Sequence, residues 1–154
     1  MEGKGGALTH VIQSQMCDCE RETVLRFSVA NVRNPGGHHI VESGPNTIQV
    51  PVTSIDRVSD ELRLSRVDYI KMDVEGAEVK ALEGAAEVIG RFHPRLCVAT
   101  EHTSDLFANT VAVIDAVKEI DDRYHYVCTE AHLWPSPSRG SVLTPFNLLF
   151  YRGR

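Results

Sequence analysis

Five ionisable residues fall where two apolar stretches of the sequence end. Lys71, Asp73 and Glu75 alternate along the first stretch, and Glu101 and His102 follow the second. Alternate residues of a strand project from the same face, so the first three are expected side by side. A carboxylate such as Asp73 can bind a cationic amine, and His102 or Glu101 can accept a proton from a hydroxyl group. The pattern therefore predicts acid–base chemistry beside a cation-binding carboxylate.

Structural roles for the same residues stay open at this point. Asp73 can cap the helix expected to begin at Gly76, and Lys71 can form a purely structural ion pair with Asp73. Glu75 and Glu78 lie near the same helix N-terminus, where the helix dipole favours acidic side chains at the surface. Glu75 is the better functional candidate of the two, because Gly76 lets the backbone turn tightly beside it.

A metal site ranks below these interpretations, and no metal ligand is assigned. The pair Cys17 and Cys19 forms a lone CxC without a second pair, which is a weak signal. An oxygen-rich site for a divalent cation could use the acidic residues and the histidine, but nothing in their spacing demands it. Those residues are Asp73, Glu75, Glu101 and His102.

The elements that carry the candidate site alternate between strand and helix. Apolar residues recur at three- and four-residue spacing in two segments, and shorter apolar runs lie between them. Such alternation makes a parallel sheet with right-handed crossovers, and the last two strands are expected to pair antiparallel because no helix fits between them. The expected elements are strand 66–74, helix 76–92, strand 95–100, helix 104–120, strand 124–129, loop 130–144 and strand 146–152. The inward face of the second helix is expected to hold Leu106, Ala112, Val113, Val117 and Ile120.

The N-terminal part of the sequence predicts further strands. Short strands are expected over 9–16, 23–32 and 47–54, separated by a polar turn at 17–22 and by loops around 34–39 and 43–46. Pro51 restricts the third of these to a sheet edge or a break. One or two helical turns should follow over 56–64, with Ser54 or Asp56 as the cap.

Length and charge narrow the class of protein. The chain has 154 residues, a net charge of −5 and four cysteines without the spacing of a disulfide framework. We expect one domain in the cytoplasm with reduced thiols, and no general nucleic-acid binding, which needs a basic face. No apolar run approaches the ~20 residues of a membrane span, and the first residues lack the apolar core of a secretory signal.

The run from Val67 to Glu78, VDYIKMDVEGAE, strongly resembles the signature of the FkbM-type methyltransferases. The surrounding segments 50–56, 82–85, 94–101 and 147–150 resemble the family's neighbouring strands and helix, so the resemblance covers roughly residues 10–152. It implies an S-adenosylmethionine-dependent enzyme of the Rossmann-like class I α/β fold, with a mostly parallel sheet and an antiparallel last strand. The acceptor implied is a hydroxyl on a sugar, glycan or other small metabolite.

The resemblance also implies roles for single residues. Asp73 would lie near the methionine amino group of the cofactor or near the acceptor hydroxyl, and Glu101 or His102 would be the base. Cys17 and Asp18 would lie at the corner that contacts the adenine ring, with Asp18 accepting from its amino group. Trp134, in a Pro-rich segment, could belong to a lid over the acceptor.

The sequence departs from the family in one respect. No strand followed by a Gly-rich turn is found for the cofactor, nor a second strand with an acidic end for the ribose, and Gly3–Gly6 reads as a loose terminus. The N-terminal strands of the family's sheet are therefore expected to be missing. Two alternatives to an active methyltransferase stay open, namely a non-catalytic interaction module of the same fold and a metal-dependent enzyme. An open sheet edge would favour homo-oligomers.

Overall fold

The computed structural model describes residues 23–28, 47–102, 105–136 and 140–153. Several features expected from the sequence lie outside these residues. They are the strand over 9–16, the turn with Cys17 and Asp18, the Gly-rich segment 3–6 and the loops of 34–46.

A four-stranded sheet forms the centre of the molecule. Its strands are β3 (Tyr69–Met72), β4 (Arg95–Ala99), β5 (Tyr124–Ser136) and β6 (Gly140–Arg152), in the spatial order β3-β4-β6-β5. β3 and β4 pair in parallel, whereas β6 is antiparallel to both of its neighbours. Three strands therefore run in one direction and the last strand of the chain runs against them. This mixed α/β sheet confirms the predicted antiparallel pairing of the last two strands.

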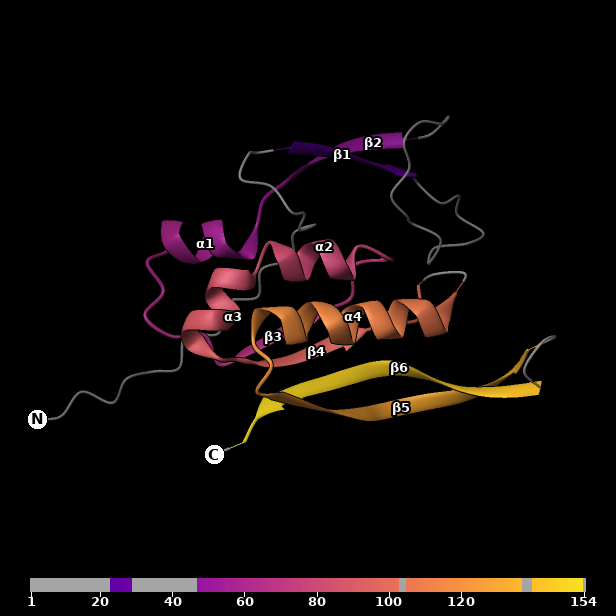
Figure 1. Ribbon diagram of the computed structural model, residues 1–154. Helices are drawn as coiled ribbons and strands as arrows, with labels where there is room; N and C mark the ends of the chain where they lie inside the picture. The colour runs from indigo at the N-terminus through magenta and orange to yellow at the C-terminus, as the bar shows by residue number, and fades with distance from the viewer. Residues whose placement is uncertain (1–22, 29–46, 103–104, 137–139, 154) are drawn as a thin grey trace, which may run out of the picture.

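Three helices cover one face of this sheet (Figure 1). They are α2 (Glu78–Glu83), α3 (Ala86–Phe92) and α4 (Leu106–Ile120), and a further helix, α1 (Ile55–Glu61), lies beside α3. Apolar side chains from this sheet face and from the helices form the core, because each element buries its apolar stripe against the other layer. The fully buried members with the largest side chains are Tyr124, Phe150, Leu82, Ile89, Leu96 and Leu148.

The helix expected over 76–92 is broken into two, which corrects the prediction. α2 ends at its C-cap Gly84, whose carbonyl accepts from the backbone N–H of Asp56 at 3.0 Å. α3 then begins anew, and the Asp56 carboxylate accepts from the N–H groups of Glu87 at 3.0 Å and Val88 at 2.8 Å. The break is stable because a residue from α1 satisfies donors that a continuous helix would have paired internally.

The other helices begin at side-chain caps. Ser54 accepts from the N–H of Arg57 at 3.1 Å, which confirms Ser54 as the cap of α1. Asp105 caps α4 by accepting from the N–H of Ala108 at 3.0 Å. The predicted inward face of α4 is correct for Val113 and Val117, which are buried, but wrong for Ala112, which is exposed; Thr110 is buried instead.

The loop expected over 130–144 is wrong. β5 and β6 continue as one long antiparallel hairpin as far as the pair Ser136 and Gly140. The Pro-rich composition suggested a loop, but the register shifts near Glu130 absorb the irregularity and let pairing resume. Stacked rings of His132 and Phe146, with centroids 4.1 Å apart, join the two strands beyond the shift. Trp134 therefore lies within β5 rather than in a separate lid.

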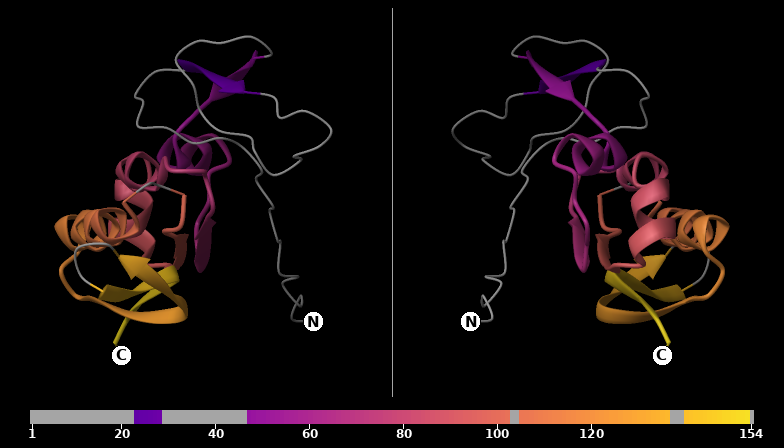
Figure 2. Two further views of the ribbon diagram at one scale, coloured as in Figure 1. Left: turned by 90° about the vertical axis from the view of Figure 1, so that its right-hand side faces the viewer. Right: turned by 90° about the vertical axis from the view of Figure 1, so that its left-hand side faces the viewer.

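A separate two-stranded sheet pairs β1 (Thr23–Ser28) with β2 (Thr47–Val52) antiparallel. Figure 2 shows it on the side of the helices away from the main sheet. The strands expected over 23–32 and 47–54 are thus confirmed over these shorter ranges. β1 pairs with β2 and not with the main sheet, and among the described residues the outer edge of β3 has no strand partner. Self-association through that edge stays a prediction.

Candidate functional site

The carboxyl ends of β3 and β4 bring the candidate residues together. The two strands are parallel and in register from Tyr69 with Arg95 to Met72 with Val98, so they end at the same side of the sheet. Asp73 follows β3 directly, and His102 lies three residues beyond the end of β4. A crevice beyond such strand ends is where ligands bind in open α/β sheets.

His102 lies between two carboxylates. Its Nε2 atom is 2.9 Å from Oδ1 of Asp73, and its Nδ1 atom is 3.3 Å from Oε2 of Glu75. The His102 side chain is 15 % exposed, whereas Asp73 and Glu75 are 47 % and 38 % exposed. A protonated ring can donate to both carboxylates, while a neutral ring can donate to only one of them. The ring thus faces one carboxylate through each of its two nitrogen atoms.

Lys71 completes what we call the carboxylate–histidine cluster, formed by Lys71, Asp73, Glu75 and His102. Its Nζ atom donates to Oδ2 of Asp73 at 2.9 Å, and both side chains are close to half exposed. This hydrogen bond lowers the pKa of Asp73, and the hydrogen bond with His102 acts in the same direction. The same contact with Asp73 raises the pKa of Lys71. Asp73 is consequently ionised at neutral pH, as a partner for a proton on His102 must be.

A tight turn carries Glu75 towards His102. The backbone of Glu75 has φ of 53° and that of Gly76 has φ of 95°, so two consecutive residues are left-handed. A side chain makes this conformation costly at Glu75, whereas Gly76 adopts it freely. The predicted tight turn at Gly76 is confirmed.

Glu78, in the helix that follows, was predicted at the surface, and the structure shows that this prediction is wrong. It is fully buried, and its Oε1 atom accepts from the N–H of Gly76 at 3.2 Å and more weakly from Val74 at 3.4 Å. The proposed cap role of Asp73 is also wrong, because α2 begins at Glu78 after Ala77 and has no side-chain cap. The sequence did carry a signal for burial, since Glu78 precedes the apolar Ala81 by one helical turn.

The segment that leads from β4 to His102 is held from two sides. Thr100 is buried and donates from its hydroxyl to the carbonyl of Pro145 at 2.7 Å. Asn109 of α4 donates from its side-chain amide to the carbonyl of Thr100 at 3.1 Å. The sheet and the helix layer thus both fix the strand end that positions His102.

Two groups of predicted site residues do not join the cluster. Glu101 is exposed and makes no hydrogen bond or ion pair with the described members of the cluster. Cys17 and Asp18 lie outside the described residues. Across the four described ranges, no group of three or more His, Cys, Asp and Glu residues is arranged to hold a metal ion.

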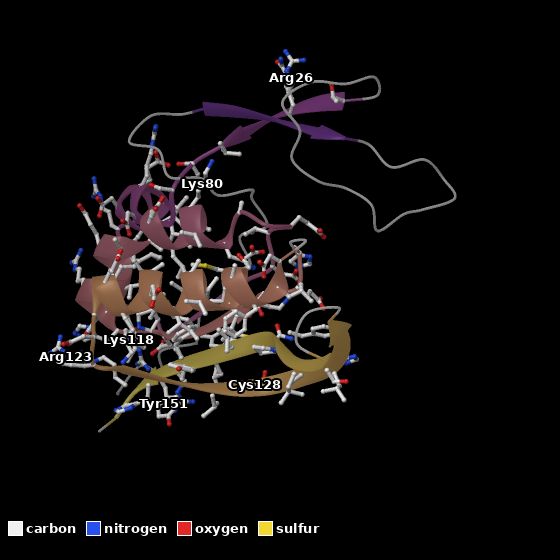
Figure 3. All side chains as sticks on the ribbon, turned by 45° about the vertical axis from the view of Figure 1, so that its right-hand side comes forward. Arg26, Lys80, Lys118, Arg123, Cys128 and Tyr151 are labelled. Carbon is white, nitrogen blue, oxygen red and sulfur yellow. The ribbon has the colours of Figure 1, made fainter. Side chains whose placement is uncertain are left out.

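A second charged cluster lies at the opposite end of the sheet, where Figure 3 shows Arg123 and Lys118. The buried Asp121 carboxylate accepts two hydrogen bonds from the Arg123 guanidinium at 2.8 and 3.1 Å. Arg152 and His93 approach the same carboxylate at 3.5 and 3.6 Å. The Arg123 hydrogen bonds lower the pKa of Asp121 to about 2. This cluster joins the end of α4 to the last residue of β6 and to the C-cap of α3.

No helix within the described ranges is both long and apolar enough to span a membrane.

Comparison with known proteins agrees with the signature around this site. None of the curated proteins matches the chain. A solved structure that is similar is that of methyltransferase FkbM from Methylobacillus flagellatus KT, with 26 % sequence identity, 67 % of this chain covered and a TM-score of 0.45. The chain spans only 24 % of that protein's length. The family model of the methyltransferase FkbM domain matches residues 4–126, which include the whole carboxylate–histidine cluster. The chain therefore belongs to the FkbM methyltransferase domain family.

Proposed function

We propose that this chain provides the acceptor side of an S-adenosylmethionine-dependent methyltransferase that methylates a hydroxyl group on a sugar, glycan or other small metabolite. One observation carries the proposal, namely the His102 ring held between Asp73 and Glu75 at the carboxyl ends of two parallel strands. The position of antiparallel β6 between β4 and β5 supports a Rossmann-like class I arrangement of the sheet. The absence of a disulfide framework in the cysteine spacing supports the cytoplasm as the compartment.

His102 is the proposed base. In the neutral ring, the shorter contact is best satisfied by Nε2–H donating to Asp73, which leaves the Nδ1 lone pair to accept a proton from the acceptor hydroxyl. Once Nδ1 carries this proton, it donates to Glu75 at 3.3 Å. Both carboxylates therefore stabilise the protonated ring that results. Glu101 is not needed for this step, and its exposed position makes it the weaker candidate.

The described residues fit one part of S-adenosylmethionine. When bound, the cofactor supplies a methyl group on a positively charged sulfur and carries a cationic amino group. Asp73 and Glu75 lie at the strand ends, and their carboxylates carry the charge opposite to that of this amino group. The Lys71 hydrogen bond lowers the pKa of Asp73 further below its ordinary value. The residues proposed for the adenine ring, Cys17 and Asp18, lie outside the described part of the chain.

Calorimetry with S-adenosylmethionine tests cofactor binding by this chain. We expect saturable heat for the wild type and a much weaker signal for Asp73→Ala. The control Asp115→Ala removes an exposed acidic residue of α4 and should behave as the wild type. No heat at millimolar cofactor would contradict a stand-alone enzyme and favour an interaction module of the same fold.

Transfer of a labelled methyl group to a panel of hydroxyl-bearing acceptors tests the chemistry. His102→Ala and Asp73→Ala should each lower the rate by about 100-fold or more, the usual size of a lost general base. A chelator should leave the rate unchanged. Loss of activity with the chelator, recovered on adding a divalent cation, would favour the metal-dependent alternative.

A further inference from the structure

We propose that Glu78 is a positioning residue for the carboxylate–histidine cluster: it holds the left-handed turn at Glu75 and Gly76 and thereby sets the contact between Glu75 and His102. The inference rests on the proposed function only for the chemistry that the cluster serves. The hydrogen bonds of the Glu78 side chain go to backbone N–H groups of the turn, so we infer that it acts through the backbone.

The contacts of Glu78 end on the turn. Its Oε1 atom accepts from the N–H of Gly76 at 3.2 Å, and Val74 donates to the same atom over 3.4 Å. These two residues flank Glu75, whose own backbone is strained at φ of 53°. A strained residue keeps its conformation only where its surroundings hold it. The buried carboxylate therefore restrains the turn on both sides of the residue that must face His102.

The burial of Glu78 is costly if its purpose is stability alone. The residue is fully buried beside the apolar core residues Ala81 and Leu82, and its Oε2 atom has no hydrogen-bond partner among the described residues. Burying a carboxyl group with one unsatisfied oxygen is unfavourable, and an apolar side chain would fill the same space without that cost. What Glu78 provides and an apolar residue cannot is the acceptor for the N–H groups of Val74 and Gly76.

Two possible roles of Glu78, stabilising α2 and positioning the cluster, can be distinguished by the effects of replacing it. Replacing a residue that merely stabilises the start of α2 would lower the melting temperature and leave the cluster as it is. Replacing a positioning residue would change the environment of the His102 ring in molecules that remain folded. His93, at the far end of the helix layer near Asp121, provides an internal reference because it lies in a different cluster.

The first measurement needs no substitution. We expect the Gly76 amide of the full chain to exchange its hydrogen slowly, at least roughly tenfold slower than an unbonded amide. A Gly76 amide that exchanges as fast as an unbonded one would overturn the proposal, even if every variant failed to fold.

The second measurement compares ¹H–¹⁵N spectra of the histidine rings without cofactor or acceptor. In Glu78→Ala we expect the His102 ring signals to move to those of Glu75→Gln, with the His93 signals unchanged. Glu78→Gln keeps an accepting oxygen and should keep the wild-type His102 signals. Glu83→Ala, at the exposed end of α2, is the matched control and should move neither ring.

The outcome is decisive in either direction. If Glu78→Ala lowers the melting temperature but leaves the His102 signals in place, the role is structural and the proposal is wrong. Because no cofactor is present, a chain that fails to bind S-adenosylmethionine can still pass this test. The positioning role and the proposed methyl transfer are therefore tested separately.

Discussion

The carboxylate of Asp56 accepts a hydrogen bond from the backbone N–H of Val88 at 2.8 Å, across 32 residues of sequence. A second bond from Glu87 at 3.0 Å completes the cap. α1 therefore supplies the N-terminal cap of α3, and the two helices are joined through one side chain. The relationship explains why the helix after the signature divides at Gly84.

Removal of this cap should destabilise the fold. We expect Asp56→Ala to lower the free energy of unfolding by about 1–2 kcal/mol, the usual cost of a lost N-cap. Asp56→Asn, which can still accept, should lose less. Urea denaturation is the measurement, and Asp60→Ala, at an exposed position of α1, is the control. Equal stability of Asp56→Ala and Asp60→Ala would contradict the capping role.

Removing the ion pair between Lys71 and Asp73 should change the pKa of Asp73. Because the Lys71 hydrogen bond lowers the pKa of Asp73, Lys71→Met should move that pKa upwards, towards the ordinary value of an aspartate. The carboxyl ¹³C signal of Asp73, followed by NMR from neutral to acidic pH, reports the midpoint. Lys118→Met, in the distant cluster, should leave the Asp73 midpoint unchanged. A midpoint that does not move in Lys71→Met would show that the pair does not persist in solution.

The buried carboxylate of Asp121 predicts a loss of stability in acid. Its pKa is lowered from 3.8 to about 2 in the folded chain, and a shift of one unit is worth ~1.4 kcal/mol, so the group contributes about 2 kcal/mol at neutral pH. A lowered carboxyl pKa gives stability that is complete above the unfolded value and is lost as the pH falls through the folded value.

Asp121→Asn should therefore be less stable than the wild type at pH 6, and the difference should shrink as the pH falls from about 4 to about 2. Denaturation midpoints at several pH values provide the measurement. The neighbouring exposed Asp122 offers a matched control as Asp122→Asn. A difference that stays constant with pH would refute the linkage.

Loss of the hydroxyl of Tyr124, the first residue of β5, should also lower the stability of the fold. The hydroxyl donates to the carbonyl of buried Pro94 at 2.7 Å, and Tyr124→Phe leaves that carbonyl without this donor. We expect a loss of about 1–3 kcal/mol. Tyr151→Phe, at an exposed position on β6, should be close to neutral. Similar unfolding free energies for the two variants would argue against a role of the Pro94 bond.

Burial also raises the pKa of Tyr124 to about 12, so stability should fall as the pH rises from 10 through 12. Ultraviolet absorbance at alkaline pH follows the ionisation of the phenols. The late-ionising component should be absent from Tyr124→Phe and present in Tyr151→Phe. A late component that persists without Tyr124 would mean that another tyrosine carries the raised pKa.

The meeting of Asp73 with His102 was predictable because it depends on two regular features. Strand alternation fixes the face on which Asp73 lies, and parallel strands end at the same side of a sheet. Glu101 lies beyond the end of β4, where strand alternation no longer applies, and its side chain is exposed.

Other features depend on contacts that local sequence patterns do not contain. The division of the helix at Gly84 is stabilised by Asp56, about thirty residues away, and no periodicity within 76–92 reports it. The sequence did not predict the hairpin beyond Glu130, because its prolines are typical of loops. Cross-strand contacts such as that of His132 with Phe146 keep the two strands together there. Glu78 was predicted at the surface because an acidic residue near a helix N-terminus is usually exposed, whereas the structure buries it.

The place of β6 has a consequence for synthesis on the ribosome. β5 precedes β6 in the chain, but it reaches the sheet only through β6, which lies between β5 and β4. During synthesis from the N-terminus, β4 can pair with β3, and the helices can pack on these two strands. The other edge of β4 stays unpaired until β6 has been synthesised. β5 has no docking place on the described sheet in that interval. The hairpin must therefore emerge almost whole before either of its strands can join the sheet.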